Sequence, residues 1–318
     1  MIKVGIAGAD SPAAGELMRL CQQHPDIDIV TAYAPRLAGR PVSEVHHGFI
    51  GEERVLFSAN FDATALDCVF LLQPLYSDSD WMKLMADRQE LKLILFPNIV
   101  DEAPVFNLAP VYGLSEMSRK PLVRGARVAT VPRAVASAAL TALYPLANHL
   151  MLAGDLNIEV EAPADIISQA SLAGARKEIL NELQRVQTSF SGQITLTPRQ
   201  SQSPRAMRLS MAIPCATRLD EVFKIYDSIY DDHNFSFMIS RRVDTAEVEG
   251  TNKIVISLWH SADDTLNIDV VADPRMRGSA GEALHVMNLL FGLHEKTGLS
   301  LPATAWRGSE NGDVKTKL

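Results

Sequence analysis

A glycine-containing turn near the start of the chain is the first segment whose residues could do chemistry. Residues 5–17, GIAGADSPAAGEL, follow a strand-like segment and open a helix-like one. Backbone amides at such a helix start can hold a pyrophosphate, and glycines let the backbone approach it. Ser11, Pro12 and Ala13 follow Gly8, where a dinucleotide turn prefers glycine and a free amide. Two alternatives stay open: a dinucleotide site on these residues, or a strand–turn–helix without a ligand.

Three cysteines are the candidate nucleophiles. Cys68 lies in the apolar run CVFLL and Cys21 in the first helix-like segment, so both are expected to be small buried side chains. Cys215 lies at a strand end in AIPCATRL and stays open as a nucleophile, which would still need a base and oxyanion donors within about 3 Å. The three are far apart and show no CxxC spacing, so neither a disulfide framework nor a zinc site is predicted.

Asp231, Asp232 and His233 could chelate an ion at a helix end. An exposed acidic cluster is the favoured interpretation, because a metal site needs converging ligands from other segments. The eight histidines form no HExxH motif, and we predict no metal.

The elements that must position these residues change in rhythm along the chain. Up to about residue 130, short apolar runs alternate with helix-length segments, which predicts an α/β fold with a doubly wound parallel sheet. The runs are KVGIAG, DIDIVTAY, LDCVFLLQ, LKLILF and ARVATV. Later strand-like segments are longer and alternate with period two, which predicts a second, mixed α+β domain. They include LNIEVEA, RLSMAIPCA, NKIVISLW and TLNIDVVA.

Two helices of the second half can be placed from their apolar spacing. One covers residues 176–190, with a stripe that includes Ile179, Leu183 and Phe190. Another begins at Thr217, which with Asp220 forms a Thr-x-x-acid start signal.

Composition bounds the kind of protein. The chain has 318 residues, 47% of them apolar, enough for one large domain or two with a proper core. Its net charge of −8 is spread without long single-sign runs, so no basic patch for nucleic acid is visible. The N-terminus lacks the pattern of a signal peptide, and no apolar stretch reaches about 18 residues. We expect a cytoplasmic protein that binds neither nucleic acid nor membrane.

Five segments together resemble the N-acetyl-γ-glutamyl-phosphate reductase family over nearly the whole chain. They are MIKVGIAGADSPAAGEL, AGRPVSEVH, PVYGLSE, PLANHLMLAGD and GSAGEALHVMNLLFGLHEKTGL. The resemblance implies a semialdehyde dehydrogenase-like fold, related to that of glyceraldehyde-3-phosphate dehydrogenase. It implies a Rossmann-like domain at residues 1–133 and 281–318, an α+β domain for catalysis and dimerisation at 134–280, and a C-terminal helix at 281–297. A homodimer or homotetramer is also implied.

NADP(H) is the cofactor that the resemblance implies. Arg36, after the second strand, could meet its 2′-phosphate, although a solvated loop arginine is the commoner case. The implied cofactor-binding residues are Gly8, Ser11, Pro12, Ala13, Arg36, Gly278 and Gly281.

The reactive groups of the family are missing here. Family members use a thiolate that attacks the acyl phosphate to give a thioester, and a histidine that handles protons. Their cysteine ends an Asn-Pro-Gly-Cys turn, which here reads Val131, Pro132, Arg133 and Ala134. Their histidine precedes a Glu-Ile that starts a helix, and that position is Ala175. A methyl group cannot form a thioester.

Three functional hypotheses follow from the resemblance. The leading one is a family member that has lost reductase chemistry and serves as a partner subunit or regulator, with a small molecule or nucleotide as its ligand. Tyr112, Gly113 and Glu116 remain in its expected substrate pocket, joined by Arg133 as a cation for an anionic ligand or as a plain loop arginine. The alternative is an active NADP(H)-dependent oxidoreductase that reduces a free carbonyl, with Tyr112 as the acid. The third, an ordinary acyl-phosphate reductase, is opposed by the missing cysteine.

Overall fold

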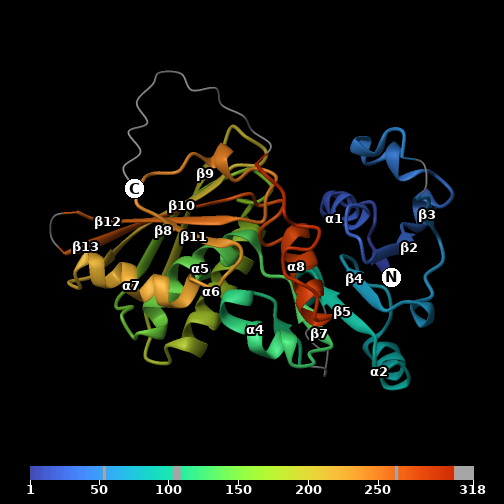
Figure 1. Cartoon of the computed structure of the whole chain (residues 1–318), viewed down its shortest axis with the longest axis horizontal. Coiled ribbons are helices and arrows are strands. Elements are labelled where there is room, and N and C mark those ends of the chain that lie inside the picture. The colour runs from blue at the N-terminus through green and yellow to red at the C-terminus, as the bar shows by residue number, and fades with distance from the viewer. Residues whose placement is uncertain (53–54, 103–108, 262–263, 304–318) are drawn as a thin grey trace.

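Two β-sheets lie side by side in the computed structural model, which describes residues 1–52, 55–102, 109–261 and 264–303 (Figure 1). The first sheet has seven strands in the order β3-β2-β1-β4-β5-β7-β6, and all of its pairs are parallel. Its strands are β1 (Ile2–Ala7), β2 (Ile27–Tyr33), β3 (Phe57–Ser58), β4 (Cys68–Leu71), β5 (Lys92–Leu95), β6 (Val111–Tyr112) and β7 (Val128–Thr130). The predicted doubly wound sheet is confirmed.

Both faces of this sheet are buried, which explains its continuous apolar runs. Ile6 and Phe70 point to the face covered by α1 (Pro12–Gln22) and α8 (Ala280–Leu290). Their neighbours Ala7 and Leu71 point to the opposite face, covered by α2 (Asp78–Asp87) and α3 (Pro97–Glu102). A helix far along the chain, α8, therefore packs beside α1 and completes the first sheet's cover (Figure 1).

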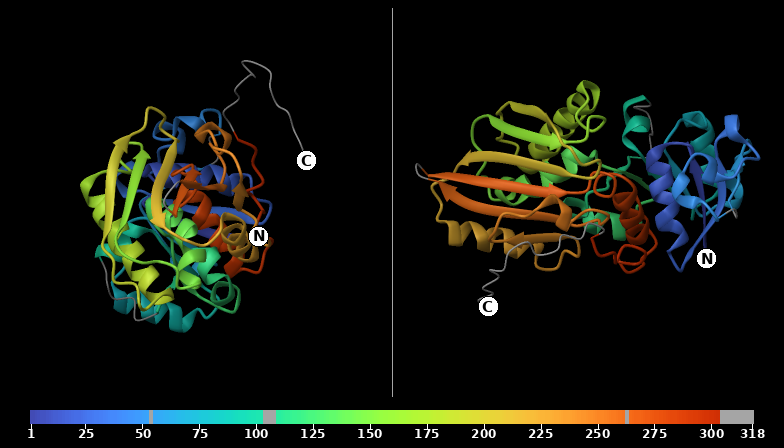
Figure 2. Two further views of the ribbon diagram at one scale, coloured as in Figure 1. Left: turned by 90° about the vertical axis from the view of Figure 1, so that its left-hand side faces the viewer. Right: turned by 90° about the horizontal axis from the view of Figure 1, so that it is seen from above.

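The second sheet is mixed and has the order β11-β12-β13-β10-β8-β9. Its strands are β8 (Leu156–Ala162), β9 (Ile194–Gln200), β10 (Met207–Pro214), β11 (Ser236–Ile239), β12 (Ile254–Ser261) and β13 (Thr265–Ala272). Alternate residues point into the second core, where α5 (Ala134–Asn148), α6 (Gln169–Val186) and α7 (Leu219–Tyr230) cover one face (Figure 2). The predicted mixed α+β part is confirmed.

Several helix limits differ from those predicted. α6 begins at Gln169 and ends at Val186, so Phe190 packs in the core from a following turn and Glu178 lies in mid-helix. α7 begins at Leu219 with Arg218 as N-cap, so the start at Thr217 is wrong. The C-terminal helix α8 ends at Leu290 rather than near residue 297. Apolar spacing marks the buried face of a helix, but its ends depend on caps that the pattern does not show.

Domain limits at residues 133 and 281 stay a prediction, part of which lies outside the described residues. Among the described residues, α4 (Ser115–Val123) and the other helices include none long and apolar enough to cross a membrane.

Candidate functional site

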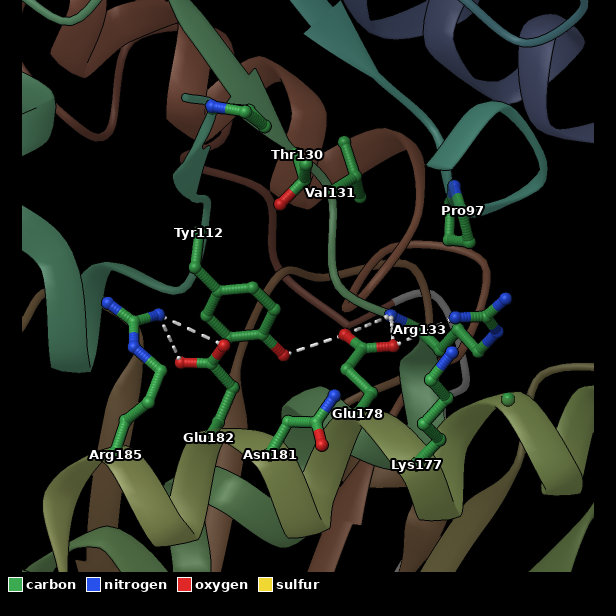
Figure 3. Close-up of a pocket in the computed structure, with 12 residues that line it drawn as sticks. Pro97, Tyr112, Thr130, Val131, Arg133, Lys177, Glu178, Asn181, Glu182 and Arg185 are labelled. Carbon is green, nitrogen blue, oxygen red and sulfur yellow. Dashed lines mark hydrogen bonds and ion pairs between the residues drawn. The ribbon is translucent and has the colours of Figure 1, made fainter. Parts of the chain in front are cut away.

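A pocket of about 540 Å³ lies where the first sheet faces α6. Tyr112 and Thr130 line it from the ends of β6 and β7, and Arg133 comes from the turn that leads into α5. Opposite them, α6 presents Lys177, Glu178 and Asn181 (Figure 3). The carboxyl ends of parallel strands are where ligands of such sheets bind, so the place suits a binding site.

Glu178 is the centre of the pocket's polar contacts. Its Oε1 accepts a hydrogen bond from the Tyr112 hydroxyl at 2.7 Å and one from the Arg133 backbone amide at 3.2 Å. Its Oε2 accepts from Arg133 Nη1 at 3.1 Å (Figure 3). Burial raises the pKa of Glu178, and the hydrogen bonds from Tyr112 and Arg133 offset this only in part. Burial and the neighbouring Glu178 carboxylate raise the pKa of Tyr112 well above its ordinary value.

Arg133 shapes the pocket through a glycine. A Cβ on Gly174 would lie 2.6 Å from the Arg133 guanidinium, so the absence of a side chain at 174 makes room for it. Arg133 is also the N-cap residue of α5. Arg133 was predicted as a cation for an anionic ligand, but the Glu178 carboxylate already balances its charge.

Ala134, which the resemblance predicts at the position of the family's nucleophile, is the first residue of α5 and offers only a methyl group. The backbone of Gly278 packs on it so closely that a Cβ there would lie 2.4 Å from the Ala134 Cα. Ala175, which the resemblance predicts at the family's histidine position, is fully buried between α6 and the second sheet, while its neighbour Gly174 lines the pocket. An apolar methyl group therefore stands at both positions.

The three cysteines are buried and free, and none of them lines this pocket. Cys21 and Cys68 belong to the core of the first sheet. Burial raises the pKa of the Cys21 thiol to about 12 and that of Cys68 well above its usual value. Cys215 follows the end of β10 that pairs with Thr265 and belongs to the core under the second sheet.

Two residues predicted for the substrate pocket lie behind its wall. Gly113 packs against β7, where an added Cβ would lie 2.0 Å from the Thr130 carbonyl oxygen. Glu116 is buried and forms an ion pair of 2.5 Å with Arg277. Burial alone would raise the pKa of Glu116, but Arg277, His233 and the Ser236 hydroxyl hold it at about 2.

The buried Arg277 is a residue that sequence reasoning missed. Its Nε lies 3.1 Å from Glu282 Oε2 and donates to Ser137 Oγ, also at 3.1 Å. Ser137 lies in the first turn of α5, so this network braces the helix that begins at Ala134. Arg277 directly precedes Gly278 in a segment noted only for its small residues, and nothing in the pattern marks it as buried.

The β1–α1 turn is a second candidate binding site, at the same edge of the first sheet. Gly8 has φ of +85°, a conformation that glycine adopts without strain. Ser11 caps α1 by accepting from the Ala14 amide, and Pro12 has no amide hydrogen. Within the first turn of α1, the backbone amide of Ala13 is therefore the donor that could bind an anion. The arrangement fits the phosphates of a dinucleotide, with fewer donors than a glycine-rich turn provides.

The other predicted cofactor residues are placed differently. Arg36 is exposed and lies after the end of β2. The carbonyl of Tyr33, the last residue of β2, accepts hydrogen bonds from the Gly8 and Ala9 amides. Gly278 and Gly281 lie at the start of α8: Gly278 meets Ala134, and a Cβ on Gly281 would lie 2.7 Å from Asn252 Oδ1. The strand order separates β1 from β7 by three spacings, so the β1–α1 turn and the Arg133 turn are about 14 Å apart.

Asp232, from the acidic cluster at the end of α7, pairs with Arg119 at 2.8 Å. Among the described residues no group of three or more metal-binding side chains is found.

Known proteins resemble this chain in sequence and in fold. The model of the semialdehyde dehydrogenase NAD-binding domain matches residues 3–123. N-acetyl-gamma-glutamyl-phosphate reductase of Parabacteroides distasonis is 30% identical, covering 96% of this chain and 100% of the relative. Its namesake in Phocaeicola vulgatus is 28% identical with the same coverage.

Solved structures agree on the architecture. Aspartate semialdehyde dehydrogenase II of Vibrio cholerae, complexed with ASA, superposes with a TM-score of 0.67 at 12% identity and covers 92% of this chain and 98% of that chain. Aspartate semialdehyde dehydrogenase of Candida albicans, with NADP, gives the same TM-score, identity and coverage. These likenesses confirm the predicted semialdehyde dehydrogenase-like fold, and the sequence match confirms the predicted family. The chain belongs to the N-acetyl-gamma-glutamyl-phosphate reductase family, whose relatives it matches over 96% of its length.

Proposed function

We propose that this chain is a non-catalytic member of its family, which binds NADP(H) but has lost acyl-phosphate reduction through a thioester. The observation that carries the proposal is Ala134, a methyl group at the first residue of α5 beside the pocket. The buried cysteines away from the pocket support it, because none is placed to take over as nucleophile. The Arg133–Glu178 pair supports it too, since both groups already satisfy each other.

NADPH binding by calorimetry, followed by turnover with N-acetyl-γ-glutamyl phosphate on the same sample, tests the proposal. We expect binding and no turnover above the rate without protein. Turnover of about 1 to 1000 per second, the range of ordinary enzymes, would refute the proposal.

Restoring the nucleophile sharpens this test. In Ala134→Cys, the new thiolate is expected to attack the acyl phosphate, so that a carbon–sulfur bond forms while phosphate leaves. Intact-protein mass spectrometry should then find one acyl group added, and Ala134→Ser is the control of similar size. In the cysteine variant, Arg133→Gly would remove the Arg133 side chain from the turn that leads into α5 and from the pocket. Histidine at 175 is less suitable, because that position is fully buried and overpacking a core costs about 1–3 kcal/mol.

A second candidate function is reduction of a free carbonyl, which needs an acid but no thiol. NADPH would supply the hydride. The hydroxyl of Tyr112, the predicted acid, already donates a hydrogen bond to Glu178 at 2.7 Å, and the pKa of Tyr112 is raised. Glu178 is the better acid, because its own pKa is raised in a pocket that a substrate could enter. NADPH oxidation with a panel of small aldehydes tests this, and Glu178→Gln should lower any activity by about 10²–10⁴-fold, more than Tyr112→Phe.

For the assembly we propose a homodimer formed through the second sheet. Helices α5, α6 and α7 pack on one face, and Trp259 of β12 is 42% exposed. Light scattering should give twice the mass of one chain. Trp259→Glu is expected to give the monomer mass, and a native protein that is monomeric would refute the proposal.

A further inference from the structure

The β1–α1 turn is held from outside by a histidine 37 residues further along the chain. His46 Nε2 lies 2.7 Å from the carbonyl oxygen of Ala9, the residue after Gly8. A carbonyl only accepts, so Nε2 carries the hydrogen and donates it. The Gly8 and Ala9 amides meanwhile donate to the Tyr33 carbonyl at 3.1 and 3.0 Å. The turn is thus clamped on one side by β2 and on the other by His46.

The His46 ring also fills a place that only glycine leaves free. A Cβ on Gly15, the fourth residue of α1, would lie 2.4 Å from His46 Nδ1, and its three nearest atoms all belong to that ring. Phe49 and Phe57 pack around the ring at centroid distances of 6.4 and 6.2 Å. Both phenylalanines are buried on the face of the first sheet that α1 and α8 cover, so the ring cannot easily turn away.

We propose that His46 is a positioning residue for the dinucleotide. By holding the Ala9 carbonyl and lying over Gly15, it keeps the turn between β1 and α1 in the shape that leaves the Ala13 amide open to a phosphate. This rests on the cofactor-binding half of the proposed function. His46 has no contact with the reacting atoms and acts through the turn.

A double-mutant cycle on the full chain tests the proposal, with NADPH as the probe and calorimetry as the readout. His46→Ala removes the donor and should lower the affinity for NADPH roughly tenfold, because NADPH binding must then also order the turn, at a cost of about one hydrogen bond. Gly15→Ala should lower it similarly, because the added Cβ must push the ring off Ala9. With the ring gone that Cβ has space, so the double variant should bind like His46→Ala alone.

A conservative variant and a stability measurement separate positioning from damage to the fold. His46→Gln keeps a side-chain donor and should recover part of the affinity. Thermal unfolding should show every variant folded at the temperature of the titration. Equal binding by native protein and His46→Ala, or losses that multiply in the double variant, would overturn the inference alone. Failure of the native protein to bind NADPH would overturn it together with the cofactor half of the proposed function.

Discussion

Two strand-to-helix turns at the same edge of the first sheet differ in what they offer a ligand. The β1–α1 turn retains Gly8 in its left-handed conformation and an open first turn of α1. The turn between β7 and α5 carries Ala134, which has no reactive group, and an Arg133 that is paired with Glu178. Binding a phosphate depends on backbone geometry that several residues share, whereas covalent catalysis depends on one sulfur atom. A single substitution can therefore end the chemistry and leave the binding turn nearly intact.

The largest expected effect concerns thiol reactivity at the turn between β7 and α5, compared with the buried thiol of Cys21 in α1. At pH 8 a thiol with the pKa of about 12 given for Cys21 is about 10⁻⁴ ionised, while an ordinary thiol with a pKa of about 8.5 is about one-quarter ionised. Ala134→Cys should therefore add one thiol that reacts with a disulfide reagent about two-thousandfold faster than Cys21. Stopped-flow labelling of native protein and variant measures this. Equal labelling rates would mean that position 134 is closed to the pocket.

Breaking the brace behind the β7–α5 turn should cost about 3–5 kcal/mol of unfolding free energy. Arg277→Met removes the guanidinium that pairs with the buried carboxylates of Glu116 and Glu282. Arg185→Met is the matched control, because that arginine pairs with Glu182 at the surface and such pairs contribute at most about 1 kcal/mol. Urea unfolding of both variants gives the comparison, and equal losses would show that the Arg277 network does not brace α5.

The β1–α1 turn can be tested through its positive φ. Gly8→Ala places a Cβ at φ of +85° and 3.2 Å from Gln73 Cγ, so we expect a loss of about 1–2 kcal/mol and weaker NADPH binding. Gly154→Ala, at φ of +69° with open space around it, should lose stability but not affinity. Calorimetry and thermal unfolding separate the two effects. Weaker NADPH binding by Gly154→Ala would remove the special role of the Gly8 turn.

A pH effect is expected from α8, which packs against α1 and α4. Burial alone would lower the pKa of His285, but Glu282 and Glu295 raise it overall. A histidine whose pKa is raised in the folded state contributes its full stabilisation below its unfolded-state pKa of about 6.5. This stabilisation falls by about 1.4 kcal/mol per pH unit between the unfolded-state and folded-state pKa values, and it is lost once the pH has risen through the folded-state value. His285→Gln should flatten this fall in urea unfolding above pH 6.5. His24→Gln should not, because burial lowers the pKa of His24 and its effect lies below pH 6.5.

Local pattern predicted the elements well and their limits less well. The five apolar runs of the first half are strands because both faces of a parallel sheet exclude water. Cys21 and Cys68 are buried, as their apolar neighbours indicated. The limits of α6 and α7 were wrong because caps such as Ser168 and Arg218 depend on local backbone geometry that apolar spacing does not report.

The candidate site was predicted only in part. Tyr112 and Arg133 line the pocket, but Glu178 was noted as a family match and not as their partner. Glu116 was expected in the pocket and instead pairs with Arg277, 161 residues away. A buried charge looks like a surface charge in sequence, because only the folded chain shows what compensates it.

The sequence by itself determined that a thiolate is absent from position 134, since residue type decides which covalent chemistry can occur. It also determined the βαβ order, because water excludes apolar runs wherever the chain takes them. Only the tertiary structure decided that Glu178 joins Tyr112 and Arg133 and that His46 lies over Gly15. These contacts join residues 31 to 66 positions apart, and such distances are determined by packing of the whole chain rather than by any local pattern.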